Sequence, residues 1–461
     1  MQFAGQRTDL ELNPIGEPVN VLIKITSDVL PEPDAIMLTG ITPQQAISEG
    51  LTEAEFLKLF YKEVVKPDTI FVGFNSIRFD DEFMRFMHYR NFYDAYEWQW
   101  ANGCSRWDIL DLVRTTRALK PDGIKWPFAP DGKPTNRLGF LTTLNKLSHE
   151  AAHDALSDVQ ATIEVARLVR SQQPELFDHL LESRKKDKVR QIVESGKPFM
   201  YTTGRYVSQY LHTSASVLIG KHAEQDYALV YDLRQDPTPF LEMSVDQLIE
   251  AWRYSKDPDS VRLPVKTLKY NRCPAIIPGV VSDKDTLKRL SLSRDDIMSN
   301  LAKLSGQGKD FADKLFQAVK QMDEAREKAQ MALVDNQLTV DDRLYDGFIN
   351  GGDKQTMRAT RAAKPEELIE FTDKFHDARL KSLLPLYKAR NFPSSLDSDE
   401  VQKWGEHCRI RLMEGGTSSS MAKYFSRLDE LSKGKLSGQQ QYILEELQLY
   451  GQSIIPEDAV G

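Results

Sequence analysis

His153 and Asp158 have the side chains and the spacing needed for metal-assisted hydrolysis. Apolar residues recur at three- and four-residue steps between Leu156 and Val169, which predicts a helix that begins near Asp154. His153 would then lie just before the first turn, and Asp158 about one turn into the helix. The carboxylate could hold a hard divalent cation, and the imidazole could accept a proton from a metal-bound water. A lone pair of this kind is more often a surface histidine beside an N-capping aspartate, so other motifs must decide.

A further carboxylate, Asp80, follows a predicted buried strand. Residues 69–73 are Thr-Ile-Phe-Val-Gly, and the pattern after them predicts a helix that begins near Asp80. Open α/β sheets bind ligands at such strand–loop–helix junctions. We therefore expect Asp80, His153 and Asp158 to converge around divalent cations at the edge of one sheet.

Aromatic side chains alternate with arginines around residues 91–114, a composition that suits the stacking of unpaired bases beside phosphates. For each of these residues the alternative stays open that it belongs to a hydrophobic core, with the aliphatic parts of the arginines packed at its surface. The residues concerned are Phe92, Tyr93, Tyr96, Trp98, Trp100, Arg106, Trp107 and Arg114.

Composition limits the class of protein. The 461 residues suffice for about three domains, and a hydrophobic content of 41% supports real cores. No apolar run approaches the ~20 residues of a membrane span, and the first residues do not have the pattern of a signal peptide. The three cysteines are far apart, which predicts free thiols in a reducing cytoplasm. The net charge of −8 argues only weakly against nucleic acid, because a local basic groove is enough for binding.

Changes of pattern divide the chain into three predicted domains. Residues 1–174 alternate strands and helices, beginning with a strand at 18–27 and including a helix at 53–65 that has a capping-box pattern. A charged helix is predicted at 175–195, and short strands with turn residues follow to about residue 275. Helices return at 284–334, which places the second domain at 175–332. The third domain, 335–461, is predicted to be helical throughout.

A set of motifs in a fixed order covers essentially the whole chain, and with these motifs the chain resembles the bacterial exonuclease I family, which degrades single-stranded DNA from the 3′ end. The motifs are Asn75–Glu82, Tyr89–Asp94, Ser105–Asp108, Ala152–Val159, Leu263–Lys266, Asn271–Pro274, Leu344–Phe348 and Tyr387–Pro393.

The resemblance implies an α/β RNase H-like exonuclease domain, followed by an SH3-like β domain and an all-α C-terminal domain. It also implies a DEDD-type active site of the histidine subclass, in which four carboxylates hold two divalent ions. By matching motif, Asp80 is the third carboxylate, Asp158 is the fourth and His153 is the general base. Mg²⁺ is the expected ion, with Mn²⁺ as a substitute. The expected reaction is two-metal hydrolysis to 5′-mononucleotides in DNA repair and recombination.

The resemblance further implies partners and contacts. The partners are single-stranded DNA and the acidic C-terminal tail of single-stranded-DNA-binding protein, which needs a basic pocket. A cytoplasmic monomer without membrane association is expected. The residues at family positions that contact DNA are Arg85, Tyr96, Trp100, Arg114 and Arg137, with Lys266 and Asn271 contributed by the SH3-like domain.

One family motif is missing. The family carries a D-x-E pair on the first strand of its sheet, whereas residues 1–9 of this sequence match the segment after that strand. Asp9-Leu10-Glu11 has the right letters, but Asn13-Pro14-Ile15-Gly16 follows and predicts an exposed turn. We therefore expect an open groove in the sheet, exposed apolar faces and half of the metal ligands. Little activity is expected of the chain as given, and a start codon placed too late is the simplest explanation.

Two other functions stay open from the sequence. The missing D-x-E pair would suit a non-catalytic single-stranded-DNA-binding or scaffold protein. An RNA-trimming exonuclease of the same superfamily shares the H-x-x-x-x-D spacing, although the small RNA trimmers lack the long β and helical extensions seen here.

Overall fold

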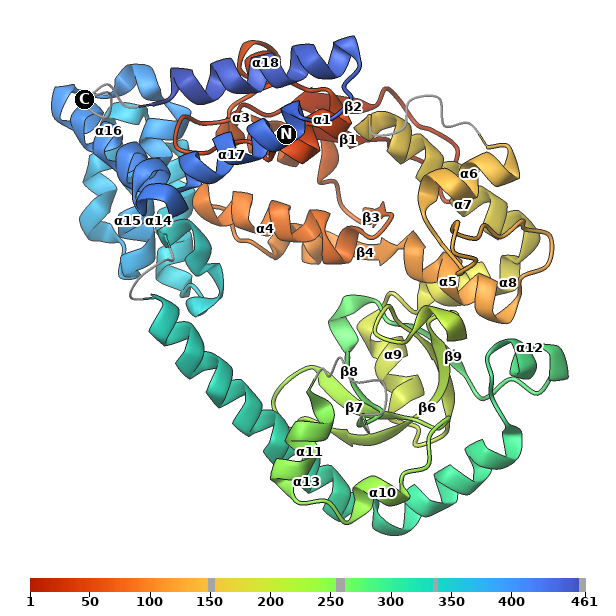
Figure 1. Cartoon of the computed structure of the whole chain (residues 1–461). Coiled ribbons are helices and arrows are strands. Elements are labelled where there is room, and N and C mark those ends of the chain that lie inside the picture. Colours follow the sequence, from red (N-terminus) through yellow and green to blue (C-terminus); the bar gives the residue numbers. More distant parts are fainter. Residues whose placement is uncertain (148–153, 254–261, 335–338, 456–461) are drawn as a thin grey trace.

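The computed structural model describes residues 1–147, 154–253, 262–334 and 339–455 (Figure 1). An α/β part comes first, a five-stranded sheet with its helices comes second, and a helical part comes last. In Figure 1 the C-terminal helices lie against the first part, and the five-stranded sheet lies at the opposite end of the molecule. Among the described residues, no helix is long and apolar enough to cross a membrane.

The strands of the first part form two separate sheets within the described residues. β1 (Gln2–Gly5) pairs antiparallel with β2 (Val19–Leu22), and β3 (Ile70–Gly73) pairs parallel with β4 (Ser105–Asp108). The strand predicted at 18–27 is thus shorter, because the chain leaves the sheet after Leu22. A cavity of about 2350 Å³ is lined by β1 on one side and by β3 on the other. The predicted groove in the sheet is therefore present.

Helices cover and connect these two sheets. They are α1 (Pro33–Thr39), α2 (Pro43–Glu49), α3 (Glu53–Leu59), α4 (Asp80–Arg90), α5 (Ile109–Leu119), α6 (Leu138–Asn145), α7 (Ala155–Gln172) and α8 (Pro174–Glu182). The predicted capping box of Thr52 and Glu55 begins α3, and a π-helical turn, Phe60–Val64, completes the helix expected at 53–65. The core between α5, α7 and α8 contains Leu112, Val165 and Phe177.

The second part is an antiparallel sheet in the order β8-β7-β6-β5-β9. Its strands are β5 (Phe199–Thr202), β6 (Thr213–Lys221), β7 (Tyr227–Asp232), β8 (Val265–Lys269) and β9 (Ala275–Pro278), and its short helices are α9 (Lys186–Val193), α10 (Thr238–Leu241), α11 (Val245–Trp252) and α12 (Lys284–Arg289). The single charged helix predicted at 175–195 is wrong, because the chain forms α8 and α9 with a break at Ser183.

One long helix, α13 (Arg294–Val334), joins the sheet to the C-terminal helices (Figure 1). It packs on β6, where Gly220 permits close approach: a Cβ atom at this position would lie 2.8 Å from Cε2 of Phe316. The helical part then contains α14 (Gly351–Ala362), α15 (Ala378–Asn391), α16 (Ser398–Met413), α17 (Ser420–Ser432) and α18 (Gly438–Ser453). The helix expected at 365–376 is a 3₁₀ segment, Pro365–Lys374.

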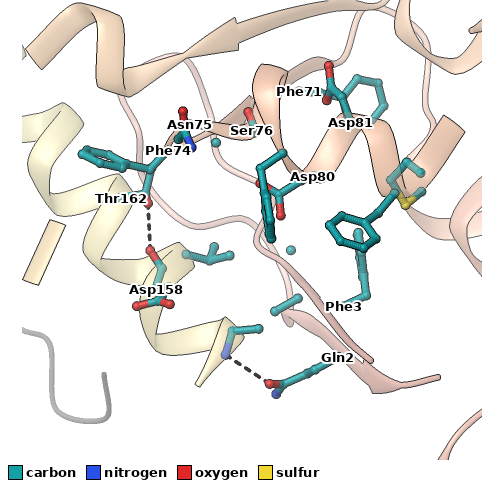
Figure 2. A pocket seen from close by; sticks show the side chains of 18 of the residues that line it. Gln2, Phe3, Phe71, Phe74, Asn75, Ser76, Asp80, Asp81, Asp158 and Thr162 are labelled. Carbon is teal, nitrogen blue, oxygen red and sulfur yellow. Dashed lines mark hydrogen bonds between the residues drawn. The ribbon is translucent and has the colours of Figure 1, made fainter. Parts of the chain in front are cut away.

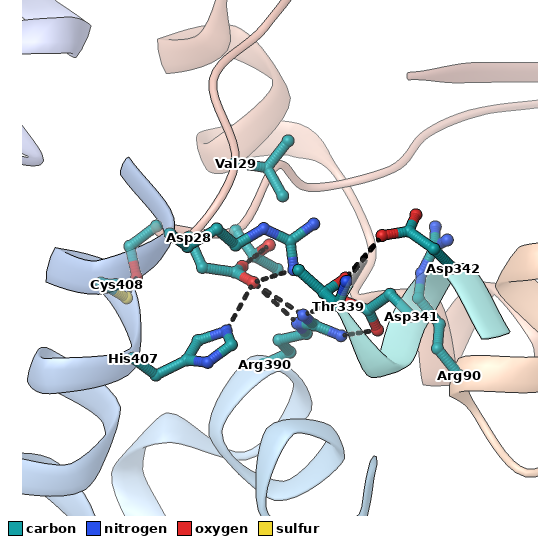
Figure 3. Close-up of polar contacts among 12 residues, drawn as sticks. Asp28, Val29, Arg90, Thr339, Asp341, Asp342, Arg390, His407 and Cys408 are labelled. Carbon is teal, nitrogen blue, oxygen red and sulfur yellow. Dashed lines mark hydrogen bonds and ion pairs between the residues drawn. The ribbon is translucent and has the colours of Figure 1, made fainter. Parts of the chain in front are cut away.

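A buried ionic network joins the helical part to the first part (Figure 3). Asp28, which is fully buried, accepts a hydrogen bond of 2.7 Å from Arg390 of α15. Arg390 also contacts Asp341, and Arg411 of α16 reaches both carboxylates. Since Asp28 and Arg390 are 362 positions apart, the network holds distant parts of the chain together.

Candidate active site

Asp80 is the first residue of α4 and lines the cavity between the two small sheets. Its side chain is exposed to that cavity, but the surrounding protein displaces water and raises the pKa of Asp80 above its ordinary value. The charge of neighbouring Asp81 raises this pKa further, against a backbone hydrogen bond that lowers it. A cation in the cavity would stabilise the ionised form of Asp80.

Asp158 enters the same cavity from α7 (Figure 2). The helix begins where the sequence predicts, because the Asp154 side chain accepts a hydrogen bond of 3.0 Å from the backbone N–H of Ser157. Asp158 lies in the first turn, and Thr162 donates to its backbone carbonyl at 2.8 Å. Figure 2 shows Asp80 and Asp158 on different walls of one pocket, so the structure brings the two predicted carboxylates to the same space.

His153, the predicted base, lies outside the described residues, and its role stays a prediction. The chain directly after it is anchored to β1. Gln2 donates to Asp154 Oδ1 at 3.0 Å and accepts from the backbone N–H of Ala155 at 3.1 Å. The start of α7 is therefore held against the strand that lines the cavity.

The donor set of the cavity is suited to a hard cation. Mg²⁺ is commonly held by one or two carboxylates, with water and substrate phosphates completing its shell. Asp80 and Asp158, which both line the cavity, are carboxylates of the number and type that one such ion requires. Over the described ranges, no group of three or more acidic, histidine or cysteine side chains has the arrangement of a metal site. These residues therefore fit one hydrated ion and do not supply the four carboxylates expected for two.

Two of the residues predicted to contact DNA line the same cavity as the two carboxylates. Arg137 is exposed at the start of α6, and Arg114 comes from α5. Arg114 Nη1 contacts Asp111 Oδ1 at 2.7 Å, and a Cβ atom at Gly204 of the second part would lie 3.2 Å from the same nitrogen. The backbone of the second part thus approaches this wall of the cavity closely.

Arg85 and Tyr96 form a partly hidden pair. The Arg85 side chain is 3% exposed, contacts Asp81 at 3.6 Å, pairs with Glu82 and lies with its Cζ atom 5.5 Å from the centre of the Tyr96 ring. A contact between Arg85 and DNA stays a prediction, but in this arrangement its two terminal guanidinium nitrogens face carboxylates, and its closest role is to fix α4. Trp100, in contrast, is 64% exposed and open to a ligand.

Lys266 and Asn271 belong to β8 and to the turn after it. Burial lowers the pKa of Lys266, with Arg205 and Arg262 adding to the effect and Asp232 opposing it. The backbone carbonyl of Asn271 accepts from Arg106 at 3.0 Å. The second part therefore contacts the first part next to the helix that carries Asp80.

Comparison with known proteins follows the same three-part order. Family models match at residues 1–166 (Exonuclease), 184–321 (Exonuclease I SH3-like domain) and 338–454 (Exonuclease I C-terminal domain). Exodeoxyribonuclease I of Haemophilus influenzae is 38% identical over 419 residues, which are 89% of this chain and 86% of the relative. This chain belongs to the exonuclease I family. The Escherichia coli relative is also 38% identical, over 88% of this chain and 85% of its own.

Solved structures of the exonuclease I family agree with the fold. Exonuclease I from Methylocaldum szegediense matches with a TM-score of 0.90 at 39% identity, covering 98% of this chain and 95% of that one. E. coli exonuclease I in complex with a dA16 oligonucleotide matches with a TM-score of 0.88 at 34% identity, with the same coverage. The predicted order of exonuclease, SH3-like and helical C-terminal domains is confirmed. Exonucleases of this family generally use divalent metal ions.

Asp108 supports the site in this member of the exonuclease I family, and the sequence did not reveal that role. It ends β4, and its side chain accepts from the backbone N–H groups of Asn75 at 2.8 Å, Ile77 at 3.3 Å and Leu110 at 2.9 Å. Burial and the charge of Asp111 raise the pKa of Asp108 to about 6. Asp108 thus fixes the loop that leads into Asp80. The residues around Asp108 in the sequence give no sign that its side chain holds this loop.

A basic cluster was also missed. It consists of Arg205, Lys269 and Arg272, near the contact between the SH3-like domain and α4. Burial lowers the pKa of Arg272, with Arg85 and Arg106 adding to the effect, and burial lowers that of Lys269, with Arg272 and Arg205 adding to it. Arg205 and Arg272 thus lie close enough to Lys269 to act on its charge, and phosphates are attracted to positive charges gathered in this way. Arg205 lies in the loop between β5 and β6, Lys269 ends β8 and Arg272 lies in the turn after it, so the fold brings these residues together and their spacing in the sequence carries no signal.

Proposed function

We propose that this protein is a 3′→5′ exonuclease that degrades single-stranded DNA to 5′-mononucleotides in DNA repair and recombination. The observation that supports this function best is the shared cavity, which is lined by Asp80 and Asp158 together with Arg114 and Arg137. Carboxylates for a metal and guanidinium groups for phosphates are the two requirements of phosphodiester hydrolysis. Relatives named Exodeoxyribonuclease I, some solved with DNA oligonucleotides, make DNA the expected substrate.

Asp80 and Asp158 would hold the divalent ion. Mg²⁺ is the ion we propose, with Mn²⁺ as a substitute and with two ions in a complete four-carboxylate site. A bound divalent ion polarises the phosphate and lowers the pKa of a bound water. His153 would accept the proton from the attacking water, because it directly precedes the anchored residue Asp154.

The remaining predicted residues would orient the strand. Arg137 and Arg114 would neutralise phosphates at the cavity, and Lys266 and Asn271 would continue that contact along the SH3-like domain. Trp100 would stack on an unpaired base, a contact worth about 1–3 kcal/mol. Tyr96 is half-buried under Arg85, so it would contribute less to stacking than Trp100.

A protein partner is part of the same proposal. A solved relative is described as an ExoI/SSB-Ct complex. We propose that this chain likewise binds the acidic C-terminal tail of single-stranded-DNA-binding protein through a basic pocket, and that it acts as a monomer. Fluorescence anisotropy with a labelled acidic tail peptide would test this, and a peptide without its acidic residues is the control. Equal binding of both peptides would reject the proposal.

The deciding experiment follows a 5′-labelled single strand in millimolar Mn²⁺ or Mg²⁺. We expect a ladder of products shortened from the 3′ end, no products in EDTA, and a loss of orders of magnitude in Asp158→Ala. Products released from the 5′ end, or activity that persists in EDTA, would contradict the proposal.

The same assay separates the two alternatives. Equal rates on matched RNA and DNA strands would favour an RNA-trimming enzyme. Tight binding of single strands with no turnover, unchanged by Asp158→Ala, would favour a non-catalytic scaffold, which the comparisons do not favour.

A further inference from the structure

Arg117 of α5 is a buried cation that the proposed function does not use. The residue is 3% exposed, and burial lowers its pKa to about 10, with no acidic neighbour among the described residues to oppose this effect. A buried charge without a counter-ion costs free energy unless hydrogen bonds satisfy its donors. The groups that Arg117 binds therefore indicate the role of this side chain.

The hydrogen bonds described for Arg117 all go to one hairpin, residues 127–136. Nη2 donates to the backbone carbonyl of Pro127 at 2.9 Å. Nη1 donates to the backbone carbonyl of Thr135 at 2.6 Å and to Oδ1 of Asn136 at 3.2 Å. Because Pro127 and Thr135 belong to opposite arms of the hairpin, the guanidinium closes its base.

The hairpin has little pairing of its own. Within the described residues its two arms meet at one antiparallel bridge, between Phe128 and Pro134. An isolated two-stranded hairpin is at best marginally stable in water. The guanidinium of Arg117 adds cation–π contacts, with its Cζ atom 5.0 Å from the ring centre of Phe128 and 5.6 Å from that of Trp126. The place of the hairpin on α5 thus depends on Arg117.

The hairpin leads directly into Arg137, which is exposed at the N-cap of α6. Thr135 and Asn136, the two residues that receive Nη1 of Arg117, immediately precede it and line the same cavity as Arg137 and Asp158. A main chain that is fixed up to residue 136 limits the directions in which the next side chain can leave it. The buried fork of Arg117 therefore restricts where Arg137 can reach.

We propose that Arg117 is a positioning residue for the substrate, because it closes the base of the hairpin and thereby holds Arg137 toward the phosphates of the single strand. This inference rests on the proposed exonuclease function. Arg117 itself is buried and does not line the cavity, so it touches neither the strand nor the ion. A guanidinium that is already held in place loses less conformational entropy when it binds a phosphate.

The test measures binding of a 5′-labelled oligothymidylate in EDTA, where no hydrolysis occurs, by anisotropy at several salt concentrations. Arg137→Ala should weaken binding and make the slope of log K against log salt concentration smaller by about 0.7, the value for one phosphate contact on a single strand. Arg117→Met should weaken binding by roughly three- to thirty-fold and reduce the slope in the same direction. In the Arg137→Ala protein, Arg117→Met should cause no further loss, because the contact that it positions is already gone.

Two further measurements separate positioning from a general loss of stability. Hydrogen exchange over residues 127–136 should become faster in Arg117→Met. Arg361→Met is the matched control: Arg361 of α14 also donates to a backbone carbonyl, that of Phe92, and its Cζ atom lies 3.9 Å from the ring centre of Tyr93. Burial lowers the pKa of Arg361 as well, but this residue does not line the cavity. Its removal should lower the urea midpoint and leave the affinity and the salt slope at their wild-type values.

Phe128→Ala keeps the test decisive if Arg117→Met does not fold. Phe128 is 63% exposed and does not line the cavity, so its removal leaves the core intact. The substitution takes away one ring that packs against the guanidinium. We expect a smaller loss of affinity than in Arg117→Met, and again no further loss in the Arg137→Ala protein.

Three outcomes would overturn the inference. Wild-type affinity, salt slope and hydrogen exchange in a folded Arg117→Met protein would show that Arg137 is placed without Arg117. A further loss caused by Arg117→Met or Phe128→Ala in the Arg137→Ala protein would show an effect that does not pass through Arg137. An equal loss of affinity in Arg361→Met would show a general effect of destabilisation. If the wild type binds and degrades single strands in these cases, the proposed function stands without this role of Arg117. If it binds no single strand, both fail.

Discussion

Asp108 is the single residue on which the position of Asp80 depends most directly. Its carboxylate accepts three backbone N–H groups, two of them in the loop that leads into α4. Asp108→Ala would leave these donors without their acceptor, at a cost of roughly 1–3 kcal/mol for each buried donor. We expect a lower urea midpoint and weaker metal binding. Asp108→Asn, which keeps one carbonyl oxygen, should lower the urea midpoint by less than Asp108→Ala does. An alanine variant with wild-type stability would show that water replaces the carboxylate.

The same residue makes stability depend on pH. Its pKa is raised to about 6, whereas an unfolded aspartate titrates near 3.8, so the folded protein binds this proton more tightly. The resulting stabilisation is fully present below about pH 3.8 and is lost as pH rises through about 6. The difference in unfolding free energy between wild type and Asp108→Asn should therefore shift in favour of the wild type from pH 7 to pH 4. A pH-independent difference would mean that Asp108 stays ionised.

Metal binding is a second prediction for single residues. Asp80 and Asp158 are the carboxylates that we propose to hold the ion, so a calorimetric titration with Mn²⁺ should give one weak site. Asp80→Asn or Asp158→Asn should abolish it, since each removes half of the charge. Asp131→Asn, at an exposed carboxylate that does not line the cavity, should leave the titration unchanged. Two tight sites in the wild type would contradict this expectation.

Motifs predicted that Asp80 and Asp158 would share one space, because their residue types and spacing are short-range features of a strand–loop–helix junction and of a helix start. Such motifs do not show which side chains are buried. Arg85 was predicted to face DNA, yet Asp81 and Glu82, four and three residues before it, pair with it in the interior. That spacing was a usable signal of ion pairs within one helix. Asp108 gave no such signal for its contacts with the loop before α4, since Asn75 and Ile77 are more than 30 positions away and only the fold brings them to it.

At the scale of elements, α4 and the turn after β8 form one unit across two domains. Arg272 donates to the backbone carbonyl of Ile77 at 3.2 Å and lies 3.5 Å from Glu82. Arg272→Ala should remove both contacts and one cation from the basic cluster. We expect weaker binding of single-stranded DNA and a salt dependence of log K that is smaller by roughly one charge, about 0.7 in slope. Anisotropy titrations at several salt concentrations would measure both.

The matched control for this element is Arg253→Ala. Arg253 ends α11 in the same domain, is mostly exposed and pairs only with Glu250 among the ion pairs described for it. Its removal should change neither the affinity nor the salt slope. A slope that falls equally in both variants would mean that the net charge of the domain, and not the cluster beside α4, determines binding.

The helices show where sequence patterns stop being sufficient. The charged segment 175–195 contains neither proline nor glycine in its interior, so it predicted one helix. Contacts outside the segment break it: Arg184 Nε donates to Ser105 at 3.1 Å, and Cys273 Sγ donates to the backbone carbonyl of Arg184. α7 needed no such contacts, because Asp154 and the apolar steps after it lie within the helix itself.

For the whole molecule, the network around Asp28 ties the C-terminal helices to the exonuclease domain. Burial would raise the pKa of Asp28, but His407, Arg390 and Arg411 outweigh it and hold this pKa well below its ordinary value. Asp341 behaves in the same way, with its pKa lowered to about 2 by Arg390 and Arg411 against the effect of burial. Both carboxylates are therefore ionised and depend on the arginines between them (Figure 3).

Removing the central arginine should loosen this contact strongly. Arg390→Met leaves two buried carboxylates with Arg411 as their remaining arginine, and breaking one partner of a buried ion pair costs about 3–5 kcal/mol. Urea unfolding should show a lower midpoint, or a separate early transition of the C-terminal helices. Arg427→Ala is the control for the same domain contact: Arg427 binds Asp34 at 2.7 Å, but both side chains are about half exposed. Exposed pairs contribute about 0–1 kcal/mol, so this variant should unfold almost like the wild type. Equal effects of the two substitutions would show that burial of the Asp28 network adds nothing, and that apolar packing alone holds the C-terminal helices in place.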